Sequence, residues 1–129
     1  MTKKAIITPQ EAVNLALAVL LDKYREHFIG IYLDARLKAK KAILISLGSL
    51  NASIVHPREV FRPAICSASA SIILLHNHPS GDTEPSTDDL AVTKRLEQAG
   101  AILGIELVDH IIFTATGKFY SMKSEKIIK

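Results

Sequence analysis

Apolar residues recur at helical spacing near the start of the chain and gather into continuous runs after it. Thr8, Pro9 and Glu11 form a capping box with proline at the first helical position, and the apolar positions continue through Leu21. Because the apolar spacing is three and four residues, we expect an amphipathic helix that ends near Tyr24.

Two apolar runs after this helix predict an antiparallel hairpin. Residues 26–34 and 42–47 are the expected strands, and the basic residues 36–41 form the turn between them. We interpret this turn as a solvated hairpin tip, and a landing place for an acidic partner is the alternative.

Helices and strands alternate along the rest of the chain. A short strand is expected at residues 53–55, and a helix from Pro57 contains Ala64, Ala68 and Ala70, which suit close packing on a sheet. Interleaved elements of this kind predict an α/β fold with a mixed sheet flanked by helices. The other expected elements are a buried strand at residues 71–75, a helix from 87 to about 98 that stops at Gly100, strands at 101–108, 111–116 and 119–122, and a solvated tail from 123.

Composition fits one folded domain. The 129 residues are 48% hydrophobic and 22% charged, with a net charge of +3, which argues against disorder. We expect a single domain over residues 1–129, with a leading helix in 1–25, a core in 26–122 and a tail in 123–129. The sequence shows no signal peptide and no apolar run near the ~18 residues of a membrane span.

Cysteine usage bears on the compartment. Cys66 is the only cysteine, so no intrachain disulfide can form, and a reducing cytoplasm is the expected location. We expect Cys66 to be a small buried residue of a helix, with a reactive thiol as the alternative.

The stretch HNHPSGDTEPSTDD, residues 76–89, combines two imidazoles, a turn and a placed carboxylate. His76 and His78 follow a buried strand, and side chains two apart on a strand face the same way, so both rings can reach one ion. Ser86 is the expected N-cap of the next helix, and Asp89 in its first turn is a third candidate ligand. Two imidazoles and one carboxylate leave a tetrahedral Zn²⁺ one open position for water, as in catalytic zinc sites.

These features also have structural interpretations. Ser86 and Asp89 form an ordinary capping-box variant, and His-x-His pairs occur without a metal. Among other acids nearby, we interpret Asp82 as bracing its own turn. Asp88 would point about 100° around the helix from Asp89.

Two further histidines need an account. His110 lies between apolar runs, and we interpret it as a partly buried structural histidine, with a supporting contact to the metal site as the alternative. His56 precedes a proline and is expected in a loop.

A hydrolytic zinc site also needs a carboxylate that accepts the proton of a water molecule. Glu26 begins a central apolar strand, where a polar group can face a cleft, and its neighbours give it no other role. Glu59 is the competitor for this role. We prefer to interpret Glu59 as an acid in the first turn of a helix, where it favours the helix dipole.

The stretch 76–89 resembles the JAMM (MPN+) metalloprotease pattern, H-x-H-P-x-G followed by P-S-x-x-D. It is most similar to the RadC-like (UPF0758) branch, which reads HNHPSG there. The resemblance implies that His76, His78 and Asp89 bind the metal and that the Ser86 hydroxyl steadies an oxyanion. It also implies that Glu26, in a segment similar to the family's E-x-F start, is the general base, and that the fold is the cytidine-deaminase-like JAB/MPN fold.

We therefore expect a zinc-dependent hydrolase of amide or isopeptide bonds, with a peptide or protein as substrate. The nitrogen and oxygen ligand set also suits other divalent ions. The resemblance leaves a second class open, because the family was named for DNA repair: a non-enzymatic nucleic-acid-binding module, or a scaffold for protein partners, with a structural metal. Nucleic-acid features are weak, since there is no Trp and only 5% of residues are aromatic.

The extent of the chain and its assembly stay open at this point. Full-length members of the similar family carry an N-terminal helix-hairpin-helix-like region, so a truncated chain is one interpretation of the single short leading helix. The sequence does not determine the substrate or the oligomeric state.

Overall fold

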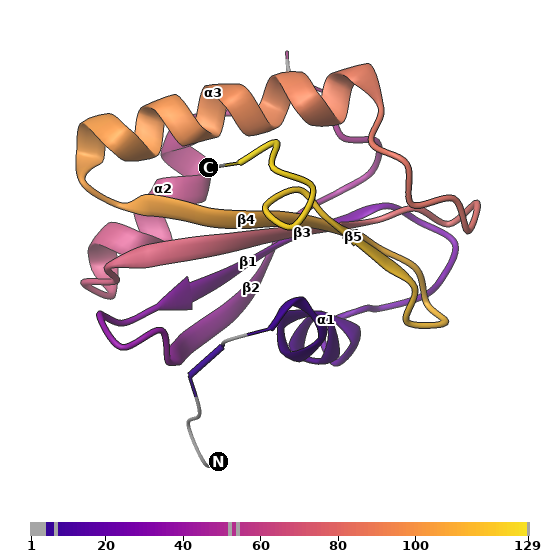
Figure 1. Cartoon of the computed structure of the whole chain (residues 1–129), viewed down its shortest axis with the longest axis horizontal. Coiled ribbons are helices and arrows are strands. Elements are labelled where there is room, and N and C mark those ends of the chain that lie inside the picture. The colour runs from indigo at the N-terminus through magenta and orange to yellow at the C-terminus, as the bar shows by residue number, and fades with distance from the viewer. Residues whose placement is uncertain (1–4, 7, 52, 54, 129) are drawn as a thin grey trace.

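The chain forms one mixed sheet covered by helices on both faces (Figure 1). The computed structural model describes residues 5–6, 8–51, 53 and 55–128. The strands are ordered β2-β1-β3-β4-β5, with α1 on one face of the sheet and α2 and α3 on the other (Figure 1). The elements of this described part are α1 (Pro9–Leu17), β1 (His27–Leu33), β2 (Ala39–Leu47), α2 (Pro57–Cys66), β3 (Ser71–Asn77), α3 (Thr87–Leu103), β4 (Glu106–Phe113) and β5 (Phe119–Ser121).

Strand pairing makes the sheet mixed, as predicted. β1 is antiparallel to both β2 and β3, β3 is parallel to β4, and β4 is antiparallel to β5. The parallel pair is joined through α3, as a crossover connection requires. The predicted α/β fold class is therefore confirmed.

The two central strands are buried along their full length, which explains their continuous apolar sequences. Alternate side chains of β1 enter different cores: Phe28 packs with α2 and α3, whereas Ile29 packs with α1. Tyr32 adds a specific tie, because its hydroxyl donates a hydrogen bond to the Val60 carbonyl of α2 at 2.7 Å. Burial raises the pKa of Tyr32, so this donor keeps its proton.

The first helix is shorter than the sequence predicts. It has the expected capping box at Thr8 but ends at Leu17, so the prediction of an end near residue 24 was wrong. The Asp22 carboxylate accepts the amides of Tyr24 and Arg25 at 2.8 and 2.9 Å, which stabilises a turn in place of further helix.

The third helix is longer than predicted, because Gly100 lies inside it. A Cβ at Gly100 would lie 2.4 Å from the Ile105 carbonyl oxygen, so glycine is required there by close packing. The helix ends at Leu103, and Gly104 takes the left-handed conformation of the cap, with φ of 73°.

The predictions of strands at 101–108 and 111–116 were wrong, because residues 101–103 belong to α3 and a single strand, β4, covers residues 106–113 with Asp109 and His110 in its middle. Both polar residues are buried, and Asp109 accepts hydrogen bonds from the Ser121 hydroxyl at 2.5 Å and the Lys123 amide at 3.0 Å. The prediction failed because polar residues with such partners do not interrupt a strand.

The second helix ends at Cys66, and Ala68 follows in the left-handed region with φ of 53°. Ala68 and Ala70 therefore lie outside the helix that was expected to include them. Cys66 is exposed, which corrects the prediction of a buried thiol.

Other differences lie at the edges of the fold. Lys40 and Lys41 belong to β2 and not to the turn before it, although both are exposed as expected, and Lys40 donates a hydrogen bond to the Ser67 carbonyl at 2.5 Å. The tail from residue 123 is not fully solvated, since Ile128 is buried in the core. Residues 53 and 55 are not in a strand, and residue 54 lies outside the described residues. Among the described helices, none combines the length and apolar character needed to cross a membrane.

Candidate metal centre

Sheet register brings distant parts of the chain together at one end of the sheet. β1 and β3 are antiparallel, so the start of β1 lies beside the end of β3, and Phe28 stands opposite His76. Glu26 immediately precedes β1, and its carbonyl accepts a hydrogen bond from the Gly48 amide at 2.8 Å. Glu26 therefore approaches His76 from the neighbouring strand.

The loop after β3 folds back onto the second histidine. The Gly81 amide donates to the His78 carbonyl at 3.1 Å, and Gly81 has a φ of 89°, a conformation that favours glycine. Asp82 Oδ1 accepts the Glu84 amide at 2.9 Å, which confirms that Asp82 braces its own turn. The Asp82 carbonyl lies 2.8 Å from His78 Nδ1.

The start of α3 brings the carboxylate. Ser86 is the N-cap, its hydroxyl oxygen accepts the Asp89 amide at 3.0 Å, and Asp89 Oδ2 accepts the Ser86 amide at 2.8 Å. The capping interpretation is thus confirmed. It does not exclude another role for Ser86, because a hydroxyl that accepts a hydrogen bond can still donate one.

Four side chains converge at this place. His76 Nε2 lies 3.1 Å from Glu26 Oε1, and His76 Nδ1 lies 3.2 Å from Asp89 Oδ1. His78 Nε2 lies 3.2 Å from Asp89 Oδ2, and the two imidazole rings are perpendicular with centroids 4.9 Å apart. Ligand atoms of Glu26, His76 and His78 all lie within 4.8 Å of one another.

Burial distinguishes the two carboxylates. The Asp89 side chain is 1% exposed, whereas the Glu26 side chain is 25% exposed. Burial by itself would raise the pKa of Asp89, but the imidazoles of His76 and His78 and the Ser86 amide outweigh it and hold that pKa well below its usual range. Asp89 is therefore a buried anion that calls for a cation, while Glu26 can reach solvent.

His78 is oriented for binding through Nε2. A carbonyl can only accept, so His78 Nδ1 carries a proton and donates a hydrogen bond to the Asp82 backbone carbonyl oxygen. Proximity of Asp89 raises the pKa of His78 despite partial burial. A metal ion bound through Nε2, which faces Asp89, would therefore have to displace a proton.

These residues fit a divalent cation such as Zn²⁺. Within the described part of the chain, neither buried ring nitrogen of His76 has a hydrogen-bond partner, although a carboxylate oxygen lies near each. Zinc–ligand bonds of ~2.0–2.2 Å place two ligand atoms at most ~4.3 Å apart. Each separation of 3.1 to 3.2 Å satisfies that limit, but His76 faces Glu26 with Nε2 and Asp89 with Nδ1, and only one of these nitrogens can bind a given ion.

Asn77 is a residue of the site that the sequence analysis missed. Its side-chain oxygen accepts the His27 amide at 2.5 Å, and its side-chain nitrogen donates to the Arg25 carbonyl at 3.0 Å. Asn77 thus fixes the backbone on both sides of Glu26. Only its position between the two histidines could have pointed to it.

His110 supports the site from behind. It is completely buried, and its Nδ1 lies 2.5 Å from the hydroxyl of Thr93, which itself donates to the Asp89 carbonyl at 2.7 Å. Burial lowers the pKa of His110 to about 3, so the ring is neutral. His110 therefore contacts the Asp89 backbone indirectly, through the Thr93 hydroxyl. It is a buried structural histidine that also supports the site.

The remaining candidates lie apart from this cluster. Glu59 is in the first turn of α2, and its side chain is 61% exposed. This agrees with its interpretation as an acid that favours the helix dipole. Among the described residues, the metal-competent group contains Glu26 and not Glu59. His56 is the N-cap residue of α2, without a side-chain cap, and Asp88 is exposed.

The known proteins similar to this chain that are described below all carry the same family name, UPF0758. A UPF0758 protein of Shouchella clausii is 52% identical over 123 residues, which is 95% of this chain and 53% of that protein. UPF0758 proteins of Methanosarcina mazei and Listeria innocua are 45% identical over 127 residues and 50% identical over 117 residues. These alignments cover 98% and 91% of this chain, and 55% and 52% of the relatives. The chain therefore spans about half the length of the curated relatives it matches.

The sequence pattern of a protein family also matches nearly the whole chain. The RadC-like JAB domain covers residues 6–127, which include all the strands and helices and every side chain of the cluster. The resemblance seen in the sequence is thereby confirmed. With a mixed α/β sheet, two converging histidines and a match across almost all of its residues, this chain belongs to the RadC-like JAB domain family.

Proposed function

We propose that this domain is a zinc-dependent hydrolase of amide or isopeptide bonds in a peptide or protein substrate. The observation that carries the proposal is the convergence of two imidazoles on a buried carboxylate, with a second, partly exposed carboxylate 3.1 Å from the first imidazole. Such a pair of acids, one buried and ionised and one facing solvent, suits a ligand and a base respectively.

In this proposal, His76, His78 and Asp89 hold the metal. Zn²⁺ at such a site supplies Lewis acidity, which lowers the pKa of water to roughly 7 and polarises a carbonyl. The low pKa of Asp89 supports its role as a ligand, because the carboxylate stays ionised at any working pH.

Glu26 is the proposed general base. It accepts a proton from the attacking water as the C–O bond forms, and it returns that proton to the amine nitrogen as the C–N bond breaks. Its greater exposure and the Asn77 contacts on both sides of its backbone support this role. Ser86 keeps a free hydroxyl proton for the oxyanion, and loss of such a donor costs on the order of 10² in rate.

The decisive experiment separates metal binding from turnover. We expect near-stoichiometric zinc by elemental analysis in the wild-type chain and none in the His76→Ala, His78→Ala double variant. Glu26→Gln should keep its zinc but fail to cleave a pool of short peptides and lysine-linked isopeptides that the wild type cleaves.

Glu106→Gln is the matched control, because it makes the same change at an exposed carboxylate that pairs with Ser71 at the start of β3, whereas His76 lies near the end of that strand. It should keep both zinc and turnover. Loss of zinc in Glu26→Gln, or full turnover by that variant, would contradict the assignment of Glu26. Absence of metal from the wild type even after zinc is added would overturn the hydrolase proposal and favour a scaffold.

A further inference from the structure

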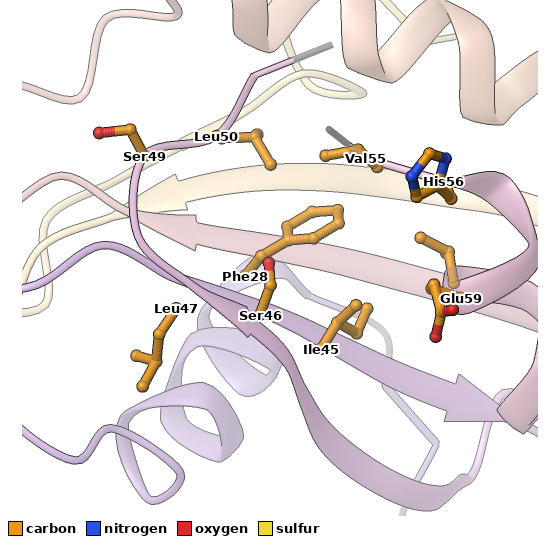
Figure 2. A pocket seen from close by; sticks show the side chains of 10 residues that line it. Phe28, Ile45, Ser46, Leu47, Ser49, Leu50, Val55, His56 and Glu59 are labelled. Atoms are coloured by element: carbon orange, nitrogen blue, oxygen red, sulfur yellow. The ribbon is translucent and has the colours of Figure 1, made fainter. Parts of the chain in front are cut away.

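A small apolar pocket lies beside the proposed metal centre, between the end of β2, the loop that follows it and the first turn of α2 (Figure 2). Its volume is about 110 Å³. Phe28 and Ile45 line it from the sheet, and Leu50 and Val55 lie over the Phe28 ring from the loop (Figure 2). The polar residues that line it are Ser46, Ser49, His56 and Glu59 (Figure 2).

Sheet register connects this pocket with the metal centre. Phe28 stands opposite Ser46 on one side and opposite His76 on the other, so these three side chains share one face of the sheet. Neighbouring strands are ~4.8 Å apart, which places the pocket wall at Phe28 only one strand spacing from His76. Glu26, two residues before Phe28, is directed to the same face.

A β-bulge shapes the floor of the pocket. Phe28 pairs with Ser46 and Ile29 pairs with Leu44, which leaves Ile45 as the extra residue. The Ile45 side chain lies over Gly30, where a Cβ would come within 3.0 Å of it. The bulge thus lets two successive residues, Ile45 and Ser46, line the same pocket.

The loop wall is held in place by hydrogen bonds. The Val55 amide donates to the Asn51 carbonyl at 3.1 Å, and Asn51 Oδ1 accepts the Ser53 amide at 2.7 Å. Arg95 of α3 donates to the Val55 carbonyl at 3.1 Å. Because the wall is tied to a core helix, the pocket exists before any ligand arrives.

We propose that this pocket binds one branched aliphatic side chain of the substrate, from a residue close to the scissile bond. The inference rests on the proposed hydrolase function. Six of the ten residues that line the pocket are apolar, and its volume lies below the ~150 Å³ of a cavity that admits benzene. Leucine, isoleucine and valine therefore match it, whereas aromatic side chains are too large and glycine leaves it unfilled.

A binding experiment tests the pocket without turnover. N-acetyl-leucine methylamide should shift the methyl resonances of Ile45, Leu50 and Val55 in an NMR titration of the full chain. The glycine and tryptophan methylamides should leave those resonances in place. Absence of a leucine-specific shift at these methyls would overturn the pocket assignment.

A pair of variants on one strand gives the matched control. Ser46→Leu places a branched side chain at the pocket edge and should abolish the leucine-specific shift. Ala42→Leu introduces the same residue at another exposed position of β2, opposite Ile31, and should leave that shift unchanged. Equal effects of the two variants would contradict the assignment.

Turnover then distinguishes the two proposals. In the peptide pool, the zinc-loaded wild type should prefer cleavage sites flanked by leucine, isoleucine or valine over glycine by about tenfold or more. Ser46→Leu should reduce this preference, and Ala42→Leu should not. Cleavage without aliphatic preference overturns the pocket alone, whereas absence of all cleavage overturns the hydrolase proposal and the pocket's substrate role with it.

Discussion

At the scale of single residues, one carboxylate serves two purposes. Asp89 completes the capping box with Ser86 and also lies 3.2 Å from both imidazoles. An aspartate that only capped the helix would not need to be 1% exposed between two histidines. Burial of an ionised acid against imidazoles is a costly arrangement unless a cation compensates it.

Asp89→Asn separates these two purposes. The side-chain oxygen of asparagine can still accept the Ser86 amide, so the helix cap should survive, whereas the charge needed by a metal is lost. We expect zinc content to fall sharply with little change in helix content, measured by elemental analysis and circular dichroism. Asp88→Asn removes a charge from the neighbouring exposed position and should keep its zinc; equal loss in both variants would contradict the assignment.

Protonation of His78 gives a second prediction at this scale. Asp89 raises the pKa of His78. Because Nδ1 already carries a proton, the proton that titrates is the one on Nε2, the nitrogen that faces Asp89. Zinc must displace that proton, so its affinity should fall as the pH is lowered from ~8 to ~5. Competition with a chromophoric chelator across this range measures the effect, and a flat affinity profile would count against His78 as a ligand.

At the scale of elements, strand ends and helix starts build the site. His76 lies near the end of β3, Glu26 lies immediately before β1, and Asp89 lies in the first turn of α3. Contacts away from the site hold these elements in place. Tyr32 ties β1 to α2 through the Val60 carbonyl, and Gly100 lets α3 pack closely against the Ile105 backbone. The site is therefore as rigid as the sheet and helix that hold it.

Gly100 offers a test of how α3 is positioned. Gly100→Ala would place a Cβ 2.4 Å from the Ile105 carbonyl oxygen, and backbone atoms cannot move aside easily. We expect a loss of about 1–3 kcal/mol in the free energy of unfolding, measured by urea denaturation. Ala101→Ser, at the next and exposed position, should change stability by less than about 0.5 kcal/mol; similar losses in both variants would argue against the packing explanation.

At the scale of the whole molecule, the metal centre joins separate segments of the chain. The proposed ligands His76, His78 and Asp89 come from β3, the loop after it and α3, and an ion held by them would cross-link these segments in the folded state only. An ion that binds the native state alone stabilises it by mass action.

Zinc should therefore raise the melting temperature of the domain. With free zinc at about a hundredfold excess over Kd, the expected stabilisation is ~2.7 kcal/mol. Thermal unfolding with zinc and with a chelator measures the difference. The His76→Ala, His78→Ala variant should show no zinc-dependent change, and an equal shift in that variant would place the zinc elsewhere.

Local sequence rules accounted for much of the fold and for part of the site. The capping boxes at Thr8 and Ser86 and the buried strands depend on neighbours a few residues away, so the sequence alone predicts them. The histidine motif also pointed to the family, because its residues are contiguous.

What the tertiary structure decided depends on contacts between distant segments. Asn77 reaches across 50 residues to the amide next to Glu26, and Gly100 stays inside α3 because Ile105 packs against it. Asp109 stays within β4 because Ser121 satisfies its carboxylate. No local pattern encodes such contacts, since they arise only when sheet register and helix packing set which residues meet. The sequence by itself determined most of the elements and pointed to both histidines and both carboxylates, whereas sheet register and helix packing decided where the elements end and at what distances these side chains meet.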